Sequence, residues 1–283
     1  MDVGKSIAAA MNQDLPSFKK PPVIETAISV QFKPVEGFTN AHLGLFWDQL
    51  RKAYPNVADA ELIAPQVELF GDQVRRKLRL PSFRVVAGEA AARLQMISED
   101  DQMMVQVQNG RLVFNWRGMS GGEYPRWRKD LPEFENAFSR LRAFLPAQGL
   151  PDVEPNQWEV TYVNHLRKGR DWGEPADWPK LLPGLIGTTG DLSTGTMESI
   201  NCNWRFVLPD NIGRLHVDLH HGFTGIEPEA AEILVLQLTA RGGSAPVGGP
   251  DICTGLAIGR SAIVRKFTEV TGPDAHKKWE RER

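Results

Sequence analysis

Apolar side chains alternate along a short segment that follows a proline pair near the N-terminus. Between Val23 and Phe32, every second residue from Ile24 onward is apolar or a threonine. A period of two is typical of a strand that buries one of its faces. Pro21 and Pro22 cannot donate ladder hydrogen bonds, so the strand should begin directly after them. We therefore predict a half-buried strand in this segment.

Three longer segments carry apolar residues at the spacing of an amphipathic helix. The apolar stripes are Leu43, Phe46, Leu50 and Tyr54; Phe134, Phe138, Leu141 and Leu145; and Leu256, Ile263, Val264, Phe267 and Val270. Pro55 and Pro146 should end the first two helices, because proline disrupts a helix interior. Asp130 should cap the start of the second helix, because Pro132 follows it by two residues and proline is favoured near the start of a helix.

Alternating runs between these helices predict further strands. They cover residues 82–87, 93–97, 103–108 and 111–116 in the first part of the chain, and 158–166, 200–207, 214–220 and 233–239 in the second. Asn109-Gly110 is a strong signal for a tight hairpin turn, since both central positions of a type I′ turn need a positive φ. Residues 241–250 are rich in glycine and are predicted to form a loop before the last helix.

The order of these elements predicts an α+β fold with antiparallel sheets and helices packed on one face. Strand, helix, strands and helix follow one another twice, and hairpin signals replace the strand–helix–strand alternation of a parallel sheet. We predict a flexible arm at residues 1–20 and two similar halves, 21–147 and 148–283, that form one compact unit. This internal duplication is inferred from the order of elements and not from residue identity.

Composition narrows the class of protein. The chain has 283 residues, with 33 Lys and Arg against 35 Asp and Glu, and a formal net charge of −2. A protein that coats nucleic acid or a membrane surface would carry a clear excess of positive charge. Two cysteines argue against a disulfide framework, and no run of about 18 apolar residues predicts a membrane span. We expect a cytoplasmic protein with no membrane partner.

One predicted strand carries the sharpest candidate for chemistry. His216, Asp218 and His220 alternate with apolar residues, so the three side chains should share one face of the strand. Neutral imidazole and carboxylate groups are ligands for a divalent metal ion, and His165 or Asp191 is a candidate for a further ligand. A solvated strand face produces the same alternation without a metal. Both interpretations fit the pattern, and no other cofactor is predicted.

Basic residues form a dense run at one place and are interleaved with an aromatic residue at another. The first group is Arg75, Arg76, Lys77 and Arg79, and the second is Arg126, Trp127 and Arg128. Guanidinium groups contact phosphates and indole rings stack on bases, so both groups are candidates for nucleic-acid contacts. Charged loops and strand edges also occur without such a role, because they prevent sheets from aggregating edge to edge.

Short motifs spread over most of the chain resemble those of a known family. They are Pro21-Pro22-Val23-Ile24-Glu25, Tyr124 and Trp127 before the second helix, the start of the strand at 158–164, and Ile263, Val264, Phe267, His276 and Trp279 near the C-terminus. The pattern is similar to a sporadically distributed prokaryotic family of uncharacterised function. That resemblance implies no reaction and no catalytic residues, and such a patchy distribution is similar to that of phage-defence and toxin–antitoxin genes.

The leading hypothesis from the sequence is a non-enzymatic interaction or sensing module, an accessory of a phage-defence or toxin–antitoxin system. It would act through a protein partner, a homo-oligomer or a ligand between the helices and the sheet. One alternative is a metal-dependent hydrolase or nuclease in which His216, Asp218 and His220 bind the metal. The other alternative is a nucleic-acid-binding protein that uses the basic and aromatic groups.

Overall fold

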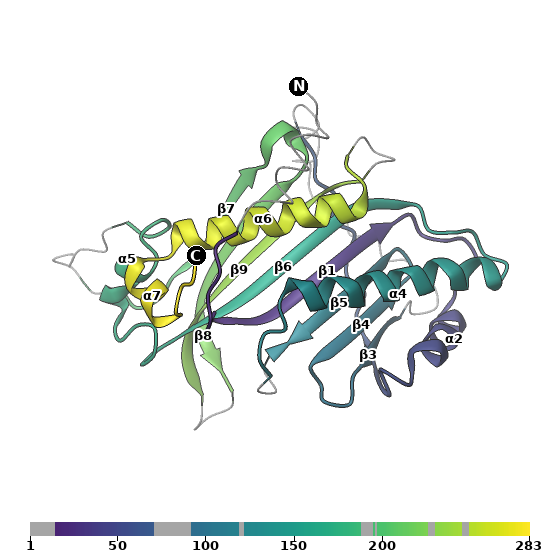
Figure 1. The fold of residues 1–283 in the computed structure, drawn as a ribbon, viewed down its shortest axis with the longest axis horizontal. Helices are drawn as coiled ribbons and strands as arrows, with labels where there is room; N and C mark the ends of the chain where they lie inside the picture. Colours follow the sequence, from purple (N-terminus) through teal and green to yellow (C-terminus); the bar gives the residue numbers. More distant parts are fainter. Residues whose placement is uncertain are drawn as a thin grey trace.

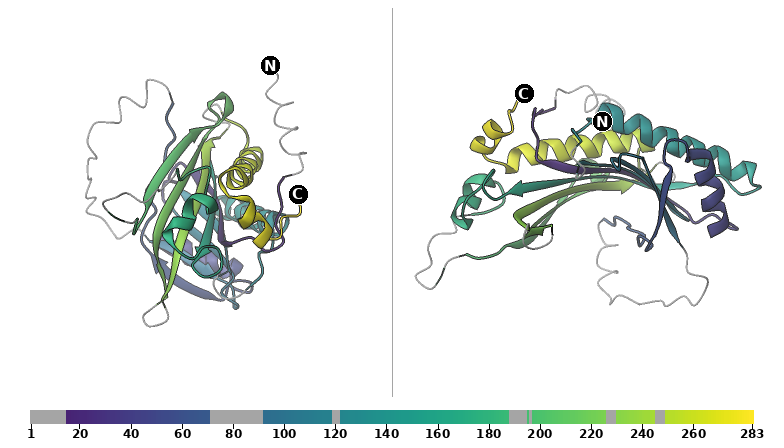
Figure 2. Two further views of the ribbon diagram at one scale, coloured as in Figure 1. Left: turned by 90° about the vertical axis from the view of Figure 1, so that its left-hand side faces the viewer. Right: turned by 90° about the horizontal axis from the view of Figure 1, so that it is seen from below.

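One antiparallel sheet runs through the whole of the described protein, and helices cover one of its faces (Figure 1, Figure 2). The computed structural model describes residues 15–70, 92–118, 122–187, 195, 197–225, 230–244 and 249–283. The strand predicted at 82–87 and the first 14 residues of the predicted arm lie outside this range.

Nine strands of the described chain form the sheet, in the order β2-β3-β4-β5-β1-β6-β9-β8-β7. Their bounds are β1 Val23–Phe32, β2 Asn56–Ala60, β3 Arg93–Ile97, β4 Met103–Gln108, β5 Arg111–Arg117, β6 Pro155–Arg167, β7 Asn201–Val207, β8 Arg214–Thr224 and β9 Ala231–Gly243. Every pair of neighbouring strands is antiparallel. Because β1 and β6 are neighbours, the strands that precede residue 148 and those that follow it occupy opposite halves of the sheet.

Five α-helices of the described chain accompany the sheet: α2 Asn40–Leu50, α4 Trp127–Ala147, α5 Trp178–Leu181, α6 Ile252–Val270 and α7 Pro273–Lys278. The helix α4 lies over β5 and β1, and α6 lies over β6, β9 and β8 (Figure 1). Figure 2 shows both long helices on the same side of the sheet. We call the opposite side, which carries no helix within the described residues, the helix-free face. Among the helices described, none is both long and apolar enough to cross a membrane.

The core lies between the long helices and the sheet. Trp158 of β6 is fully buried, and its indole ring lies directly against α6. Two glycines make this approach possible, because a Cβ atom on Gly255 would lie 2.2 Å from the indole and one on Gly259 would lie 2.8 Å from it. A larger residue at either position would push α6 away from the sheet, so these glycines determine how closely helix and sheet pack.

Most of the predicted elements are confirmed. The strand after the proline pair is β1, and α2 buries Leu43, Phe46 and Leu50 of the first predicted stripe. This helix ends at Leu50, before the predicted end at Pro55, so Tyr54 is buried outside it. Asn109-Gly110 joins β4 to β5 in a two-residue turn, but only Gly110 has a positive φ, of +100°, so the turn is not of type I′. The antiparallel α+β class is confirmed as well, although one continuous sheet replaces the separate sheets that the sequence predicts.

The start of α4 differs from the prediction. The helix begins at Trp127, so Asp130 lies within its first turn and does not cap it. The Asp130 side chain points instead to β1, where its carboxylate accepts a hydrogen bond of 2.9 Å from the Thr26 hydroxyl. Pro132 and Pro146 both lie inside α4. Pro132 is the sixth residue of the helix, so α4 lacks the hydrogen bond that an N–H at this position would donate to the carbonyl of Arg128.

Two strands also differ from the prediction. The sequence pattern does not predict β2, because this edge strand is almost wholly exposed and therefore has no buried face to create an alternation. The strand β9 continues to Gly243, whereas a loop was predicted from residue 241 onward. Arg241 lies in register between Glu159 of β6 and Arg214 of β8, and this pairing extends the strand.

Residues 15–20, which the sequence predicts to be part of the flexible arm, lie against the C-terminal segment. The backbone N–H of Lys20 donates to the carbonyl of Trp279 at 3.0 Å. Phe18 is buried, with ring centroids 5.6 Å from Phe267 and 6.0 Å from Trp279. These aromatic contacts join two ends of the chain that no local sequence pattern connects.

Candidate functional site

A cavity of about 750 Å³ lies between α4 and α6 and reaches the residues of β1 and β6 beneath them. We call it the α4–α6 cavity. Much of its wall is aromatic or aliphatic, with Phe18, Tyr124, Trp127, Tyr162, Ile263 and Phe267 among the lining residues. Asn164, Cys253, four arginines and two glutamates add polar groups. A small set of polar groups among apolar walls is the usual composition of a small-molecule site.

Three arginines from the two helices bring positive charge to this cavity. Arg126 is the N-cap residue of α4, Arg128 lies in its first turn, and Arg260 comes from α6. The Arg260 guanidinium lies 5.5 Å from the centre of the Trp127 ring, a cation–π contact. Its Nε atom is buried and has no hydrogen-bond partner among the described residues. Because a buried donor without a partner costs free energy, this N–H favours an acceptor on a bound molecule.

Two tyrosine hydroxyls meet at the wall of the cavity. The Oη atoms of Tyr124 and Tyr162 are 3.0 Å apart, and the two rings pack edge to face. Burial raises the pKa of both phenols, while the positive charge of Arg260 acts in the opposite direction. Both hydroxyls are therefore protonated at neutral pH, so the pair can donate and accept hydrogen bonds without carrying charge.

A buried carboxyl group lies close to the tyrosine pair. Asp130 is almost completely buried between α4 and β1, and its charge contributes to the raised pKa of Tyr124 and Tyr162. Burial raises the pKa of Asp130 from 3.8 to about 7, although the hydrogen bond from Thr26 opposes the shift. The carboxyl therefore changes its charge near neutral pH.

The cysteine of the cavity is not activated. The Cys253 thiol lies 3.5 Å from the carboxylate of Glu135 on the facing helix. Burial of the thiol, together with the hydrogen bond and negative charge of Glu135, raises the pKa of Cys253 to about 11. Since the thiolate and not the thiol is the nucleophile, Cys253 is a weak nucleophile at neutral pH.

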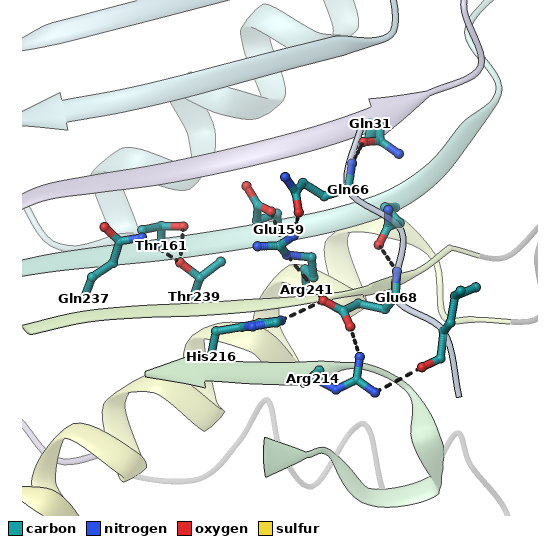
Figure 3. A network of polar contacts seen from close by, with 12 residues as sticks. Gln31, Gln66, Glu68, Glu159, Thr161, Arg214, His216, Gln237, Thr239 and Arg241 are labelled. Atoms are coloured by element: carbon teal, nitrogen blue, oxygen red, sulfur yellow. Dashed lines mark hydrogen bonds and ion pairs between the residues drawn. The ribbon is translucent and has the colours of Figure 1, made fainter. Parts of the chain in front are cut away.

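The helix-free face carries a second polar cluster, centred on Glu68 (Figure 3). The Glu68 carboxylate lies 2.7 Å from Nε2 of His216 and 3.6 Å from Nε of Arg241, and it also forms an ion pair with Arg214. Burial by itself would raise the pKa of Glu68, but the hydrogen bond and charge of His216, with the charges of the two arginines, lower it. Glu68 is therefore an ionised carboxylate with its counter-charges around it.

The strand β8 places His216, Asp218 and His220 on the helix-free face, as the alternation predicts, while Val217 and Leu219 are buried on the other side. The first of these histidines contacts a carboxylate of the chain, as described above. In the register of the sheet, Asp218 lies between Asn203 of β7 and Gln237 of β9.

Of the two further ligands that the sequence suggested for a metal, only His165 lies among the described residues, and it stands apart from this group. His165 of β6 and His220 of β8 flank Val235 of β9, so their backbones are two strand spacings, or about 10 Å, apart. Asp191 lies outside the described residues. Across the part of the chain that the structure describes, no group of three or more His, Cys, Asp or Glu side chains is arranged to bind a metal ion. The metal site therefore stays a prediction.

The structure brings one of the two basic groups to the α4–α6 cavity. Arg126, Trp127 and Arg128 line it together with Arg260. The other group, made up of Arg75, Arg76, Lys77 and Arg79, lies outside the described residues. A nucleic-acid surface that combines both groups therefore stays a prediction.

Arg260 is the site residue that the sequence reasoning missed. It falls four residues after Leu256 and three before Ile263, on the apolar stripe of α6. Asp130 likewise lies on the apolar stripe of α4, one helical turn before Phe134. A charged residue on an apolar stripe must find a partner or a ligand inside the protein, so this irregularity is the signal that would have identified both positions.

Comparison with known proteins gives no relative for this chain: no family model, no curated protein and no solved structure matches it. The function is therefore argued from the chemistry of the cavity and of the helix-free face.

Proposed function

We propose that this protein is a non-enzymatic ligand-binding module that senses a small organic anion in the α4–α6 cavity. The observation that supports this proposal best is that Arg260 lines the cavity with a buried Nε that has no hydrogen-bond partner, while no carboxylate of the described residues forms an ion pair with its guanidinium. Four arginines and only two glutamates line the same cavity, so its charge favours an anion. A ligand carboxylate or phosphate would accept hydrogen bonds from the guanidinium groups.

The volume and the walls of the cavity indicate the rest of the ligand. A volume of about 750 Å³ lies inside the range of about 300–1,000 Å³ that is typical of small-molecule sites. Trp127 and Phe267 offer flat apolar surface, and the hydroxyls of Tyr124 and Tyr162 offer neutral hydrogen-bonding groups. These features favour a ligand with a flat apolar part and one anionic group. Nucleoside monophosphates and aromatic carboxylates have this chemistry.

The chemistry of the cavity favours binding over catalysis. Its thiol, Cys253, has a raised pKa, and so do its two phenols, so each is held in the unreactive protonated form at neutral pH. A nucleophile or general base would need a shift in the opposite direction. Asp130, whose pKa burial raises to about 7, is not among the lining residues, so the cavity wall offers hydrogen-bonding groups without an activated one, which suits a sensing module.

We also propose that the sheet arose from two equivalent halves. Two observations support this relation: β1 and β6 are central neighbours, and β5-β4-β3 and β9-β8-β7 extend outward from them in the same order. In addition, α4 follows β5 and α6 follows β9. On this view the cavity lies between two equivalent helices, at the junction of the halves, where ligand sites are common.

Ligand binding can be tested with the purified full-length chain. We expect at least one compound from a panel of nucleoside monophosphates and aromatic carboxylates to raise the melting temperature and to bind in isothermal titration calorimetry. Arg260→Gln should weaken that binding at least tenfold, because it removes a charged donor from a buried contact; such a contact contributes about 1.5–3 kcal/mol. The matched control is Arg142→Gln on α4, whose guanidinium pairs with Asp152 at the surface and does not line the cavity.

Three outcomes would contradict the proposal. They are the absence of any binding below millimolar concentration, equal binding by the Arg260→Gln protein, and equal weakening by Arg142→Gln. If only a single-stranded oligonucleotide binds, and this binding falls steeply with salt, the nucleic-acid hypothesis for Arg126, Trp127 and Arg128 replaces the sensing proposal. A role as an accessory of a phage-defence or toxin–antitoxin system is a separate prediction, and the neighbouring genes would test it.

A further inference from the structure

Residues 61–70 lie across the helix-free face, and we call this segment the strap. Successive residues of the strap form hydrogen bonds with side chains from successive strands of the sheet. Arg93 of β3 donates to the carbonyl of Glu61, and Gln108 of β4 bonds both the N–H and the carbonyl of Ile63. Further on, Gln31 of β1 accepts from the N–H of Gln66, Gln157 of β6 accepts from the N–H of Glu68, and Arg214 of β8 donates to the carbonyl of Leu69. The strap therefore runs across the strands and not along them.

The length of the strap shows that it is nearly fully extended. From β3 to β8 there are six strand spacings, which amount to about 29 Å at roughly 4.8 Å each. The eight residue steps from Glu61 to Leu69 span at most about 28 Å. The two lengths agree closely, and the side chains of the sheet that form the hydrogen bonds span the remaining distance. The strap is therefore close to fully extended, and it forms no strand of the sheet.

Most of these hydrogen bonds are made to the backbone of the strap and not to its side chains. Five sheet residues bond its N–H or carbonyl groups at distances between 2.7 and 3.2 Å. Backbone contacts of this kind accept many sequences. Among the described residues, polar groups also contact three strap side chains. Gln66 accepts a hydrogen bond of 2.7 Å from Arg241, Glu68 pairs with Arg214, His216 and Arg241 (Figure 3), and the Arg214 guanidinium lies 4.8 Å from the centre of the Phe70 ring.

Glu68 balances a positive charge that belongs to the sheet. Arg111, Arg214 and Arg241 lie together on the helix-free face, where Glu159 pairs with the first and third of them. Without Glu68, three guanidinium groups would share that single carboxylate. The Glu68 side chain is only 6% exposed, so its contacts are shielded from solvent. This position therefore requires an acidic group from whatever chain lies across the face.

We propose that the helix-free face is a binding site for an extended acidic peptide segment of a partner protein, and that the strap occupies this site within the same chain. Glutamine and arginine side chains of the sheet bind the peptide backbone, and Arg214, His216 and Arg241 select a glutamate. The site lies on the opposite side of the sheet from the α4–α6 cavity and does not rest on the function proposed for that cavity.

The test uses the full-length chain and a fluorescein-labelled synthetic peptide with the sequence of residues 61–70. Glu68→Gln weakens the strap without changing its size. We expect the Glu68→Gln protein to bind the peptide at least tenfold more tightly than the unchanged protein, as measured by fluorescence anisotropy. The reason is that an intact strap competes at an effective concentration of about a millimolar.

Two matched variants test how the peptide is recognised. Replacing the glutamate of the peptide by glutamine should weaken binding at least tenfold, and so should Arg214→Gln in the Glu68→Gln protein. Arg205→Gln is the control, because Arg205 is an exposed residue of the neighbouring strand β7. Equal binding of the two peptides, or equal effects of the two arginine substitutions, would overturn the proposal.

A second release variant covers the case in which Glu68→Gln does not fold. Ile63→Pro removes the N–H that Gln108 binds and leaves the Glu68 cluster unchanged. Peptide binding by a folded Ile63→Pro protein supports the proposal. If neither variant folds, or if the folded variants do not bind the peptide, the strap is an obligatory part of the fold and the proposal is wrong. A concentration-dependent dimer of the released variants would instead assign the site to the strap of a second copy and overturn the partner assignment.

Discussion

Arginine side chains lie on both sides of the sheet, from β8 and β9 on the helix-free face and from α4 and α6 on the other side, but they meet different surroundings. On the helix-free face, Arg214 and Arg241 pair with Glu68, which the chain itself supplies. In the α4–α6 cavity, Arg260 lies against Trp127 and forms no ion pair with a carboxylate of the described residues. A cluster of arginines therefore does not by itself identify a ligand site. What matters is whether the protein supplies the counter-charge.

The two faces also respond to pH in opposite directions. The pKa of Asp130, on the helix side, is raised, so the folded protein prefers this group protonated. The pKa of Glu68, on the helix-free face, is lowered, so the folded protein prefers this group ionised. Asp130 therefore costs stability as the pH rises, whereas Glu68 contributes stability that is lost when the pH falls through its folded-state pKa.

The largest effect is expected for Asp130→Asn. Between about pH 4 and pH 7 the folded chain retains a proton on Asp130 that the unfolded chain has lost, so the stability of the unchanged protein should fall across this window. A shift from 3.8 to about 7 corresponds to about 4 kcal/mol at roughly 1.4 kcal/mol per unit. The stability of the asparagine variant should not fall in this way, because asparagine does not ionise. The variant should therefore be the more stable protein at pH 8.

Urea unfolding of both proteins between pH 4 and pH 8 measures this difference. It should be small near pH 4, grow up to pH 7 and stay constant above that. A difference that does not change with pH would show that Asp130 is ionised throughout, and that the contrast between the two faces does not exist.

A smaller effect, about 1–3 kcal/mol of destabilisation, is expected for Gly255→Ala, because the new methyl group overlaps the Trp158 ring and pushes α6 outward. The α4–α6 cavity changes shape with that helix, so binding of its ligand should weaken. Binding of the strap peptide to the Glu68→Gln protein should stay the same, since the strap contacts only the other face. Thermal unfolding and the two binding assays separate these effects.

Gly44→Ala provides the control for that substitution. Gly44 lies in α2, and a Cβ atom there would meet nothing within 4 Å. Alanine is the better helix former by about 1 kcal/mol, so this variant should be slightly more stable than the unchanged protein. Equal destabilisation by both alanines would mean that the contact with Trp158 does not position α6.

The smallest effect concerns the strap in mild acid. As the pH falls below 4.5, Glu68 approaches its lowered folded-state pKa and begins to lose its ion pairs with Arg214, Arg241 and His216, while nearby Glu159 keeps Arg241 partly paired. The amides of residues 63, 66 and 68 should then exchange a few times faster, after correction for intrinsic rates. Hydrogen-exchange mass spectrometry reports this change, and Glu68→Gln should show fast exchange at every pH. Protection that does not change with pH would mean that the carboxylate does not hold the strap.

Much of the fold could be predicted because local patterns determine it. The alternation in β1 and β8, the Asn109-Gly110 turn and the apolar stripe of α2 each follow from residues close in the chain. The exposed edge strand β2 and the first turn of α4 were missed for a related reason. At those places the decisive contacts are absent or distant: β2 has no buried face, and Asp130 bonds Thr26, which lies 104 residues earlier.

The candidate sites show the same division more strongly. The sequence placed His216 on one face of its strand, but not beside Glu68, which lies 148 positions away. It marked Arg126, Trp127 and Arg128 as a basic and aromatic group, but not their position beside Arg260 of the last long helix. Contacts over such separations leave no periodic signal, because each partner only has to fit the other once the sheet has formed.

By itself, the sequence determined the antiparallel α+β fold class, the main strands and helices, and the face on which the residues of the alternating strands lie. These properties follow from hydrophobic periodicity and turn chemistry, which act over a few residues. The tertiary structure alone decided which charges are neutralised within the chain and which are left to a ligand. The reason is that burial and counter-charges come from strands and helices brought together from opposite ends of the chain.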